Sequence, residues 1–183
     1  MEEEVEVPVV KGALKLGVIV GVVSVILTFI AYVVDSTLFA NWWFNLGIGL
    51  ITLVAVVVLG ISFRNSNGGY MSFGQAFLFC FLTFAVAGLL SALFNILLYT
   101  VIDTELAEFV VNETIRKTTE VYEKLGLPQA QVDEQIETME NDLRAGFTPA
   151  GFIKNYLLVM IGYAVLSLIT GLIVKKNEPI EDY

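Results

Sequence analysis

The chain has 183 residues, of which 56% are apolar, a larger share than in globular proteins, and its formal charge is −9. The acidic balance disfavours a nucleic-acid-binding surface, and the single cysteine, Cys80, excludes an intrachain disulfide and a thiolate metal cluster. The chain contains no histidine, which removes the commonest general base and metal ligand of enzymes.

Four long apolar runs dominate the chain. They contain 19, 20, 27 and 19 residues without Asp, Glu, Lys or Arg, and they cover residues 16–34, 44–63, 76–102 and 156–174. Since about 20 helical residues span a hydrocarbon core of about 30 Å, each run can cross a bilayer. A soluble protein of this size could not hide four such helices from water. We therefore predict a single all-α membrane domain over residues 1–183, with transmembrane helices at about 12–34, 44–63, 74–102 and 152–174.

The ends of these helices carry orientation signals. The residues Met1–Glu6 are acidic, whereas a secretion signal begins with a basic leader, so we expect the first helix to stay in the mature protein. The loop of residues 35–43 has no basic residue, and five lie near the other helix ends: Lys11, Lys15, Arg64, Lys175 and Lys176. Basic residues favour the cytoplasmic side, so both termini are predicted to be cytoplasmic. Aromatic residues are expected as interface anchors, with Tyr70 near the inner end and five at the outer ends, namely Tyr32, Trp42, Trp43, Tyr99 and Tyr156.

The segment between the third and fourth apolar runs has a different character. Residues 103–151 hold 11 acidic and four basic residues, a net charge of −7. Apolar residues recur there at helical spacing, first from Val111 to Leu125 and then from Val132 to Phe147. Gly126 and Pro128 separate the two stripes as helix stop and helix start. The pattern predicts an extramembrane helical hairpin at about 104–147.

Charge spacing supports the hairpin helices. Three Glu residues precede a basic residue by four positions, an arrangement that stabilises a helix by about 0.2–0.5 kcal/mol per pair. The pairs are Glu113–Lys117, Glu120–Lys124 and Glu140–Arg144. The acidic side chains are expected to form a solvated face that a protein partner could contact. No calcium site is predicted, because six to eight oxygens on a turning loop are required.

Small and polar residues inside the apolar runs are predicted to pack helices together. Small residues let helix backbones approach closely, and an amide in lipid seeks a hydrogen-bond partner on a neighbouring helix. The helix-packing candidates are Gly17, Gly21, Gly88, Ala92, Asn95, Ser167 and Gly171. No catalytic, cofactor-binding or metal-binding residues are predicted, and the chain is not expected to be an enzyme.

Three segments carry a resemblance to a known family. They cover residues 67–77, 99–103 and 171–176 and read NGGYMSFGQAF, YTVID and GLIVKK. Over essentially its whole length, the chain resembles the bacterial membrane family called domain of unknown function 4199. The resemblance implies a small inner-membrane protein with four helices and no assigned activity, so that the hairpin would be periplasmic. In the family Asp103 is often followed by proline, whereas this chain has Thr104, which favours a helix that continues from the third apolar run into the hairpin.

Two functions are compatible with these features. The first is a structural or interaction component, either scaffold or regulatory, whose partners are the lipid bilayer and a protein that contacts the acidic hairpin. The alternative is a small transporter or channel component that acts as an oligomer, with Thr83, Ser91 and Asn95 lining a path, because transport needs polar groups at membrane depth. The oligomeric state stays open, and no cofactor is expected.

Overall fold

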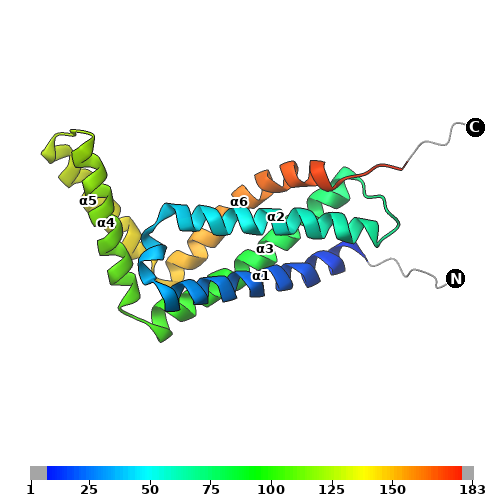
Figure 1. The fold of residues 1–183 in the computed structure, drawn as a ribbon, viewed down its shortest axis with the longest axis horizontal. Coiled ribbons are helices and arrows are strands. Elements are labelled where there is room, and N and C mark those ends of the chain that lie inside the picture. Colours follow the sequence, from blue (N-terminus) through cyan, green and yellow to red (C-terminus); the bar gives the residue numbers. More distant parts are fainter. Residues whose placement is uncertain (1–7, 179–183) are drawn as a thin grey trace, which may run out of the picture. The chain divides into compact units, whose positions relative to one another are not determined.

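The computed structural model describes residues 8–178, and the acidic start of the chain lies outside them. This part of the chain contains six α-helices and no strand (Figure 1). The helices are α1 (Val9–Val34), α2 (Trp42–Asn65), α3 (Phe73–Leu97), α4 (Leu106–Lys124), α5 (Gln129–Gly146) and α6 (Pro149–Val174). Two short segments join them, a 3₁₀ turn η1 (Ser36–Ala40) and a π-helical turn η2 (Leu98–Ile102). The all-α prediction is confirmed for the described residues.

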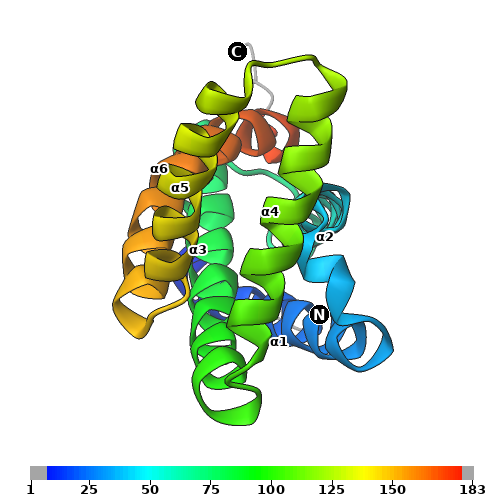
Figure 2. The same ribbon diagram turned by 90° about the vertical axis from the view of Figure 1, so that its left-hand side faces the viewer.

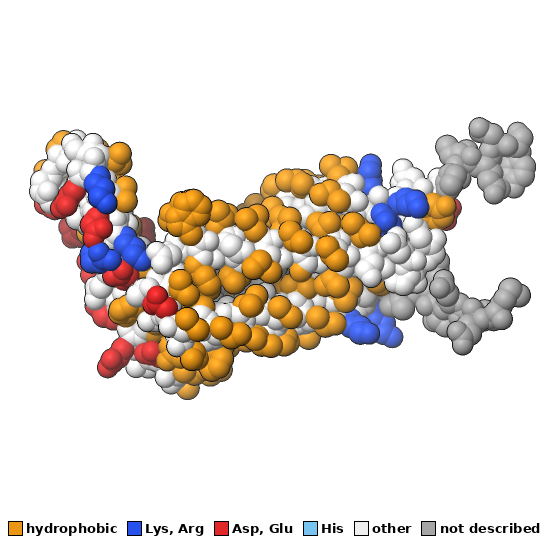
Figure 3. Space-filling view, viewed as in Figure 1, with side chains coloured by type: hydrophobic (Ala, Val, Ile, Leu, Met, Phe, Trp, Pro, Cys, Tyr) orange, Lys and Arg blue, Asp and Glu red, His pale blue; other side chains and the backbone are white. Residues whose placement is uncertain are grey.

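Four of these helices are long and apolar enough to cross a membrane. They are α1, α2, α6 and the continuous segment of α3 and η2. The helices extend past the apolar runs, so that α1 begins at Val9 and α6 at Pro149. Their surfaces carry large apolar side chains, including Ile161, which is 68% exposed, and Val54, which is 57% exposed. Apolar side chains cover these helices in Figure 3, as expected for surfaces that face lipid.

Contacts divide the chain into two units, each with its own core. Within the described residues, unit 1 comprises residues 8–25, 48–91 and 157–178, and unit 2 comprises residues 26–47 and 92–156. The four long helices therefore contribute residues to both units. Unit 2 also contains all of α4 and α5.

The core of unit 1 is apolar and tightly packed. Phe79 is fully buried, and its ring stacks on that of Phe63 with centroids 4.9 Å apart. Arg64 at the end of α2 donates from Nη1 to the carbonyl of Val174, with an N–O distance of 2.8 Å. The main chains of Met71 and Lys176 exchange hydrogen bonds of 2.8 and 2.9 Å. These contacts hold the end of α2, the residues before α3 and the end of α6 together.

In unit 2, the chain breaks between the third membrane helix and α4, so the continuous helix that Thr104 favours is not formed. Asp103 has extended backbone, with φ −143° and ψ 92°, and its N–H closes the π-helical turn on the carbonyl of Leu98 at 2.9 Å. Its Oδ1 accepts hydrogen bonds from the backbone N–H groups of Glu105 at 3.1 Å and Leu106 at 3.0 Å. Tyr32 donates its hydroxyl to Oδ2 at 3.1 Å. The aspartate therefore supplies the break without a following proline, because its carboxylate satisfies N–H groups at the start of α4.

The turn between α4 and α5 depends on a glycine. Gly126 has φ +70°, a conformation that side chains other than glycine rarely adopt. The N–H of Leu127 then bonds to the carbonyl of Tyr122 at 3.3 Å, which closes the end of α4. The two helices lie side by side after this turn, as Figure 2 shows.

Candidate functional site

Polar contacts hold α4 in place within unit 2. Arg144 on α5 forms a bidentate contact with Glu108 on α4, and its Nη2 lies 2.8 Å from Glu108 Oε1. Lys117 on α4 donates to Asn41 Oδ1, which follows η1, at 2.8 Å. These contacts attach α4 to α5 on one side and to the loop between α1 and α2 on the other.

The same contacts alter the acidity of the carboxyl groups involved. Hydrogen bonds from Arg116 lower the pKa of Glu113 to about 2, and Lys117 contributes in the same direction. Arg144 lowers the pKa of Glu108 through its hydrogen bonds, against a smaller opposing effect of burial. Hydrogen bonds from Thr37 lower the pKa of Asp35, which caps η1. All three carboxylates stay ionised at neutral pH.

One predicted charge pair is wrong. Glu120 forms its ion pair with Arg116, four residues before it, and not with Lys124. Glu113–Lys117 and Glu140–Arg144 do form ion pairs, with N–O distances of 3.4 and 2.9 Å. Arg116 bridges Glu113 and Glu120 because its planar guanidinium can donate in two directions at once.

An aromatic cluster joins α5 and α6 to the end of the third membrane helix. Tyr99 is only 7% exposed, and its ring centroid lies 4.8 Å from that of Phe147, 5.6 Å from that of Phe152 and 6.3 Å from that of Phe39. The interpretation of Tyr99 as an interface anchor is therefore wrong, since its ring packs inside the protein. The two tryptophans, in contrast, are 62% and 66% exposed and stack on each other.

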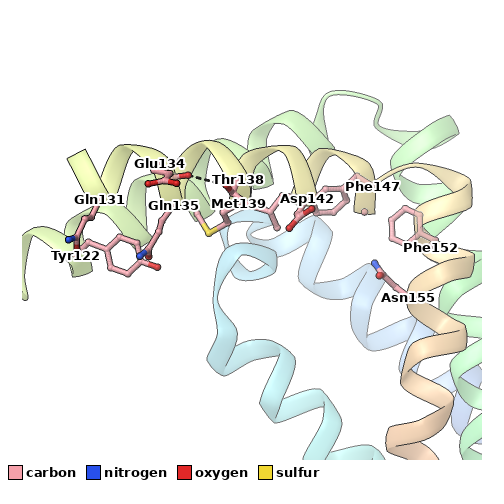
Figure 4. A pocket seen from close by; sticks show the side chains of 12 residues that line it. Tyr122, Gln131, Glu134, Gln135, Thr138, Met139, Asp142, Phe147, Phe152 and Asn155 are labelled. Carbon is pink, nitrogen blue, oxygen red and sulfur yellow. Dashed lines mark hydrogen bonds between the residues drawn. The ribbon is translucent and has the colours of Figure 1, made fainter. Parts of the chain in front are cut away.

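A groove of about 810 Å³ runs along α5 and reaches the start of α6 (Figure 4). Five of the residues that line it are apolar or aromatic, and most of the others are polar or acidic. Its lining comprises Tyr122, Gln131, Glu134, Gln135, Thr138, Met139, Asp142, Leu143, Gly146, Phe147, Phe152 and Asn155. On α5 these positions recur every three or four residues, so one face of the helix forms a wall of the groove. Its volume falls within the range of about 300–1,000 Å³ that is typical of ligand pockets.

The groove has an acidic character. Glu134 and Asp142 contribute carboxylates, and no Lys or Arg belongs to the lining. Arg144 is nearby in sequence, but its guanidinium is engaged by Glu108 and Glu140. Figure 3 shows further Asp and Glu side chains over the α4–α5 region. The groove can therefore attract a cation that also has an apolar part.

The packing candidates in unit 1 lie at close helix contacts. A Cβ atom at Gly17 would lie 2.8 Å from Val86 Cβ, and one at Gly21 would lie 2.7 Å from a methyl of Leu90. A Cβ atom at Gly171 would lie 3.1 Å from the backbone nitrogen of Phe77. At these three positions α1 and α6 approach α3 closely, which a larger residue would prevent.

The remaining candidates have different surroundings. A Cβ at Gly88 would lie 2.5 Å from the hydroxyl of Tyr163, whereas Ser167 is fully buried and donates to the carbonyl of Tyr163 in its own helix at 2.6 Å. In unit 2, Ala92 and Asn95 are half-buried. The amide of Asn95 makes no hydrogen bond to the described part of the chain, so the structure gives no partner helix for it.

Comparison with known proteins connects this architecture to a family. A family model described as "Protein of unknown function (DUF4199)" matches residues 15–176. The chain belongs to this family. Membership in DUF4199 confirms the resemblance carried by the segments around Gly69, Asp103 and Lys175. Neither a curated protein nor a solved structure matches the chain. The comparisons therefore assign no activity to it.

Several residues that build the site in this DUF4199 protein were not predicted. Phe152 and Asn155 lie at the start of α6, and sequence spacing does not connect them to α5. The contact between Lys117 and Asn41 joins residues 76 positions apart. One sequence signal indicates the contact between α5 and α6. Thr148 and Pro149 start α6 directly after the end of α5, and this short connection forces the two helices to meet.

Proposed function

We propose that this protein is a multi-pass inner-membrane scaffold whose α4–α5 segment forms an extramembrane hairpin that binds a protein partner. The observation that carries the proposal is the contrast between the four apolar helices and the α4–α5 segment. The residues 103–151 carry a net charge of −7, whereas the apolar runs carry no charge. A hairpin with charged, exposed faces is suited to recognition in water, where electrostatic complementarity guides the choice of partner.

The tip of the hairpin supports the same function. Leu125 is 68% exposed and Val121 is 52% exposed, next to the acidic residues Glu120 and Glu123. Apolar side chains surrounded by charges are typical of protein-binding surfaces. We infer that the partner presents an apolar patch flanked by basic residues.

The proposed topology places both termini in the cytoplasm and the hairpin in the periplasm. It is supported by the five basic residues near one set of helix ends, and by the absence of basic residues from the loop 35–43. Reporter fusions after Gly126 and after Lys176 test it. A periplasm-dependent phosphatase should be active only in the first fusion, and a cytoplasm-dependent fluorescent protein only in the second. The reverse pattern would overturn the topology.

Site-specific photocrosslinking in intact membranes tests the scaffold function. A photoreactive residue at Leu125 should give a protein adduct, whereas one at Ile161, which is equally exposed at 68% but lies in a membrane helix, should react only with lipid. Reversing charges with Asp133→Lys and Glu137→Lys should remove the adduct at Leu125. A scaffold that binds through the hairpin is excluded if Leu125 forms no protein adduct, or if charge reversal has no effect.

The absence of histidine from the chain supports a function without catalysis.

The transporter alternative has one observation in its favour, the half-buried Asn95 amide without a described partner. The hydroxyls of Thr83 and Ser91 bond to carbonyls of their own helix, at 2.7 and 3.1 Å, which favours a packing role for them. Flux in reconstituted vesicles that is abolished by Asn95→Leu would replace the scaffold proposal with this alternative.

A further inference from the structure

We propose that the groove beside α5 binds the headgroup of a phospholipid that carries a primary ammonium group, with Asp142 receiving the ammonium. One face of α5 and the first turns of α6 form the groove, and Phe152 and Asn155 are the lining residues from α6 (Figure 4). This inference rests on the proposed placement of α4 and α5 outside the membrane, but it concerns a different ligand from the protein partner proposed for the hairpin.

The position of the groove relative to the bilayer indicates a lipid as the occupant. The apolar run of α6 begins at Tyr156, one residue after Asn155 and four after Phe152. At 1.5 Å per residue, Phe152 lies about 6 Å along the helix from the start of that run. The headgroup layer on one side of a bilayer is about 5–7 Å thick. Phe152 and Asn155 therefore lie at the depth of the headgroups, where phospholipids surround the protein at high local concentration.

The charges of the lining select the kind of headgroup. Asp142 is exposed and has no ion pair in the described part of the chain, and Glu134 is the second carboxylate of the groove. A headgroup with a phosphate alone would be repelled by these carboxylates and by the net charge of −7 around them. An ammonium group is attracted, while the amide of Asn155 can donate a hydrogen bond to the phosphate of the same lipid.

The rest of the groove suits the apolar part of a lipid. Met139, Leu143, Phe147 and Phe152 contribute apolar side chains to the lining, and Figure 4 shows Asp142, Phe147, Phe152 and Asn155 around the same end of the groove. The rings of Phe147 and Phe152 pack edge to face, with their centroids 6.1 Å apart. The glycerol region of the lipid can contact these side chains while the ammonium reaches the carboxylate.

Native mass spectrometry of the full chain tests the proposal. The protein is released from vesicles that contain equal amounts of phosphatidylethanolamine, phosphatidylcholine and phosphatidylglycerol, and the retained lipids are counted. We expect retention of phosphatidylethanolamine, reduced about threefold by Asp142→Asn, which corresponds to the loss of a partly exposed ion pair. Glu137→Gln is the matched control, since it removes a carboxylate of α5 outside the groove.

Equal retention of the three lipids, or equal retention by Asp142→Asn and the wild-type chain, would overturn the proposal. A photoreactive residue at Met139 then identifies the occupant in native membranes. An adduct with phosphatidylethanolamine supports the proposal, whereas an adduct with another protein or a second copy of the chain, or no adduct, contradicts it. The double variant Asp133→Lys, Glu137→Lys should leave the lipid adduct intact, which separates this result from the test of the scaffold function.

Discussion

Gly151 provides a sharp test of how α5 connects to α6. An added Cβ there would lie 2.1 Å from the carbonyl oxygen of Ala145 and 2.6 Å from that of Gly146, whereas ordinary contacts are 3.4–4 Å. Both oxygens belong to the backbone, so the start of α6 would have to move by about 1 Å or more. The N–H of Gly151 also donates to Thr148 Oγ1 at 3.0 Å, which caps α6.

The expected cost of Gly151→Ala follows from three contributions. Overpacking costs about 1–3 kcal/mol, and loss of the Thr148 cap costs about 1 kcal/mol. The higher helix propensity of alanine offsets about 1 kcal/mol of this loss of stability. We therefore expect the free energy of unfolding to fall by about 1–3 kcal/mol, with the loss centred on the junction that positions the groove.

Gly162→Ala is the matched control on the same helix. A Cβ at Gly162 meets no atom within 4 Å, so this variant should be neutral or stabilised by about 1 kcal/mol. Thermal unfolding in detergent compares the two variants, and hydrogen exchange of peptides that cover residues 143–156 locates the effect. If Gly151→Ala unfolds like the wild-type chain and its junction exchanges no faster, the close approach at this turn is not required.

Three further outcomes follow from the packing and the charges. Tyr99→Leu should destabilise unit 2 by about 1–3 kcal/mol through the loss of its ring contacts, measured as faster hydrogen exchange in α4 and α5. Because the pKa values of Glu108 and Glu113 are lowered in the folded chain from 4.5, their contribution to the stability of α4 is complete above pH 4.5 and is lost as the pH falls towards 2. Circular dichroism against pH should show this loss, and Glu113→Gln should reduce it. Gly17→Leu should lower the thermal unfolding temperature in detergent, because its side chain would collide with Val86, whereas Gly47→Leu, where a Cβ meets no atom within 4 Å, should not.

The sequence predicted the helices well, because lipid imposes a simple requirement on length and composition. A run such as Tyr156–Val174 has one stable form in a bilayer, a helix that satisfies its own backbone. The helices α4 and α5 were also predicted, since Gly126 and the apolar stripes follow general rules of helix ends and faces. These features depend on neighbouring residues and can be read from a single sequence.

The candidate site depends on contacts between distant residues, and for this reason it was not predicted. The break at Asp103 requires a carboxylate that binds the N–H groups of Glu105 and Leu106 and also receives the hydroxyl of Tyr32, which is 71 residues away. The burial of Tyr99 requires Phe147 and Phe152, about 50 residues later in the chain. Composition gave the acidic character of the segment, but the groove exists only because α5 and α6 meet at a tight turn.

The two units are stabilised by different interactions, and this difference bears on where function resides. Unit 1 relies on close approach of small residues such as Gly17 and Gly171, which is how helices associate when lipid removes the hydrophobic driving force. In unit 2, α4 and α5 are attached by exposed ion pairs and by an aromatic cluster, and exposed ion pairs contribute only about 0–1 kcal/mol each. The aromatic cluster around Tyr99 must therefore supply most of the stability that holds α5 over α6. A ligand that packs against Phe147 and Phe152 would add to this same cluster, so occupancy of the groove should stabilise the position of α5.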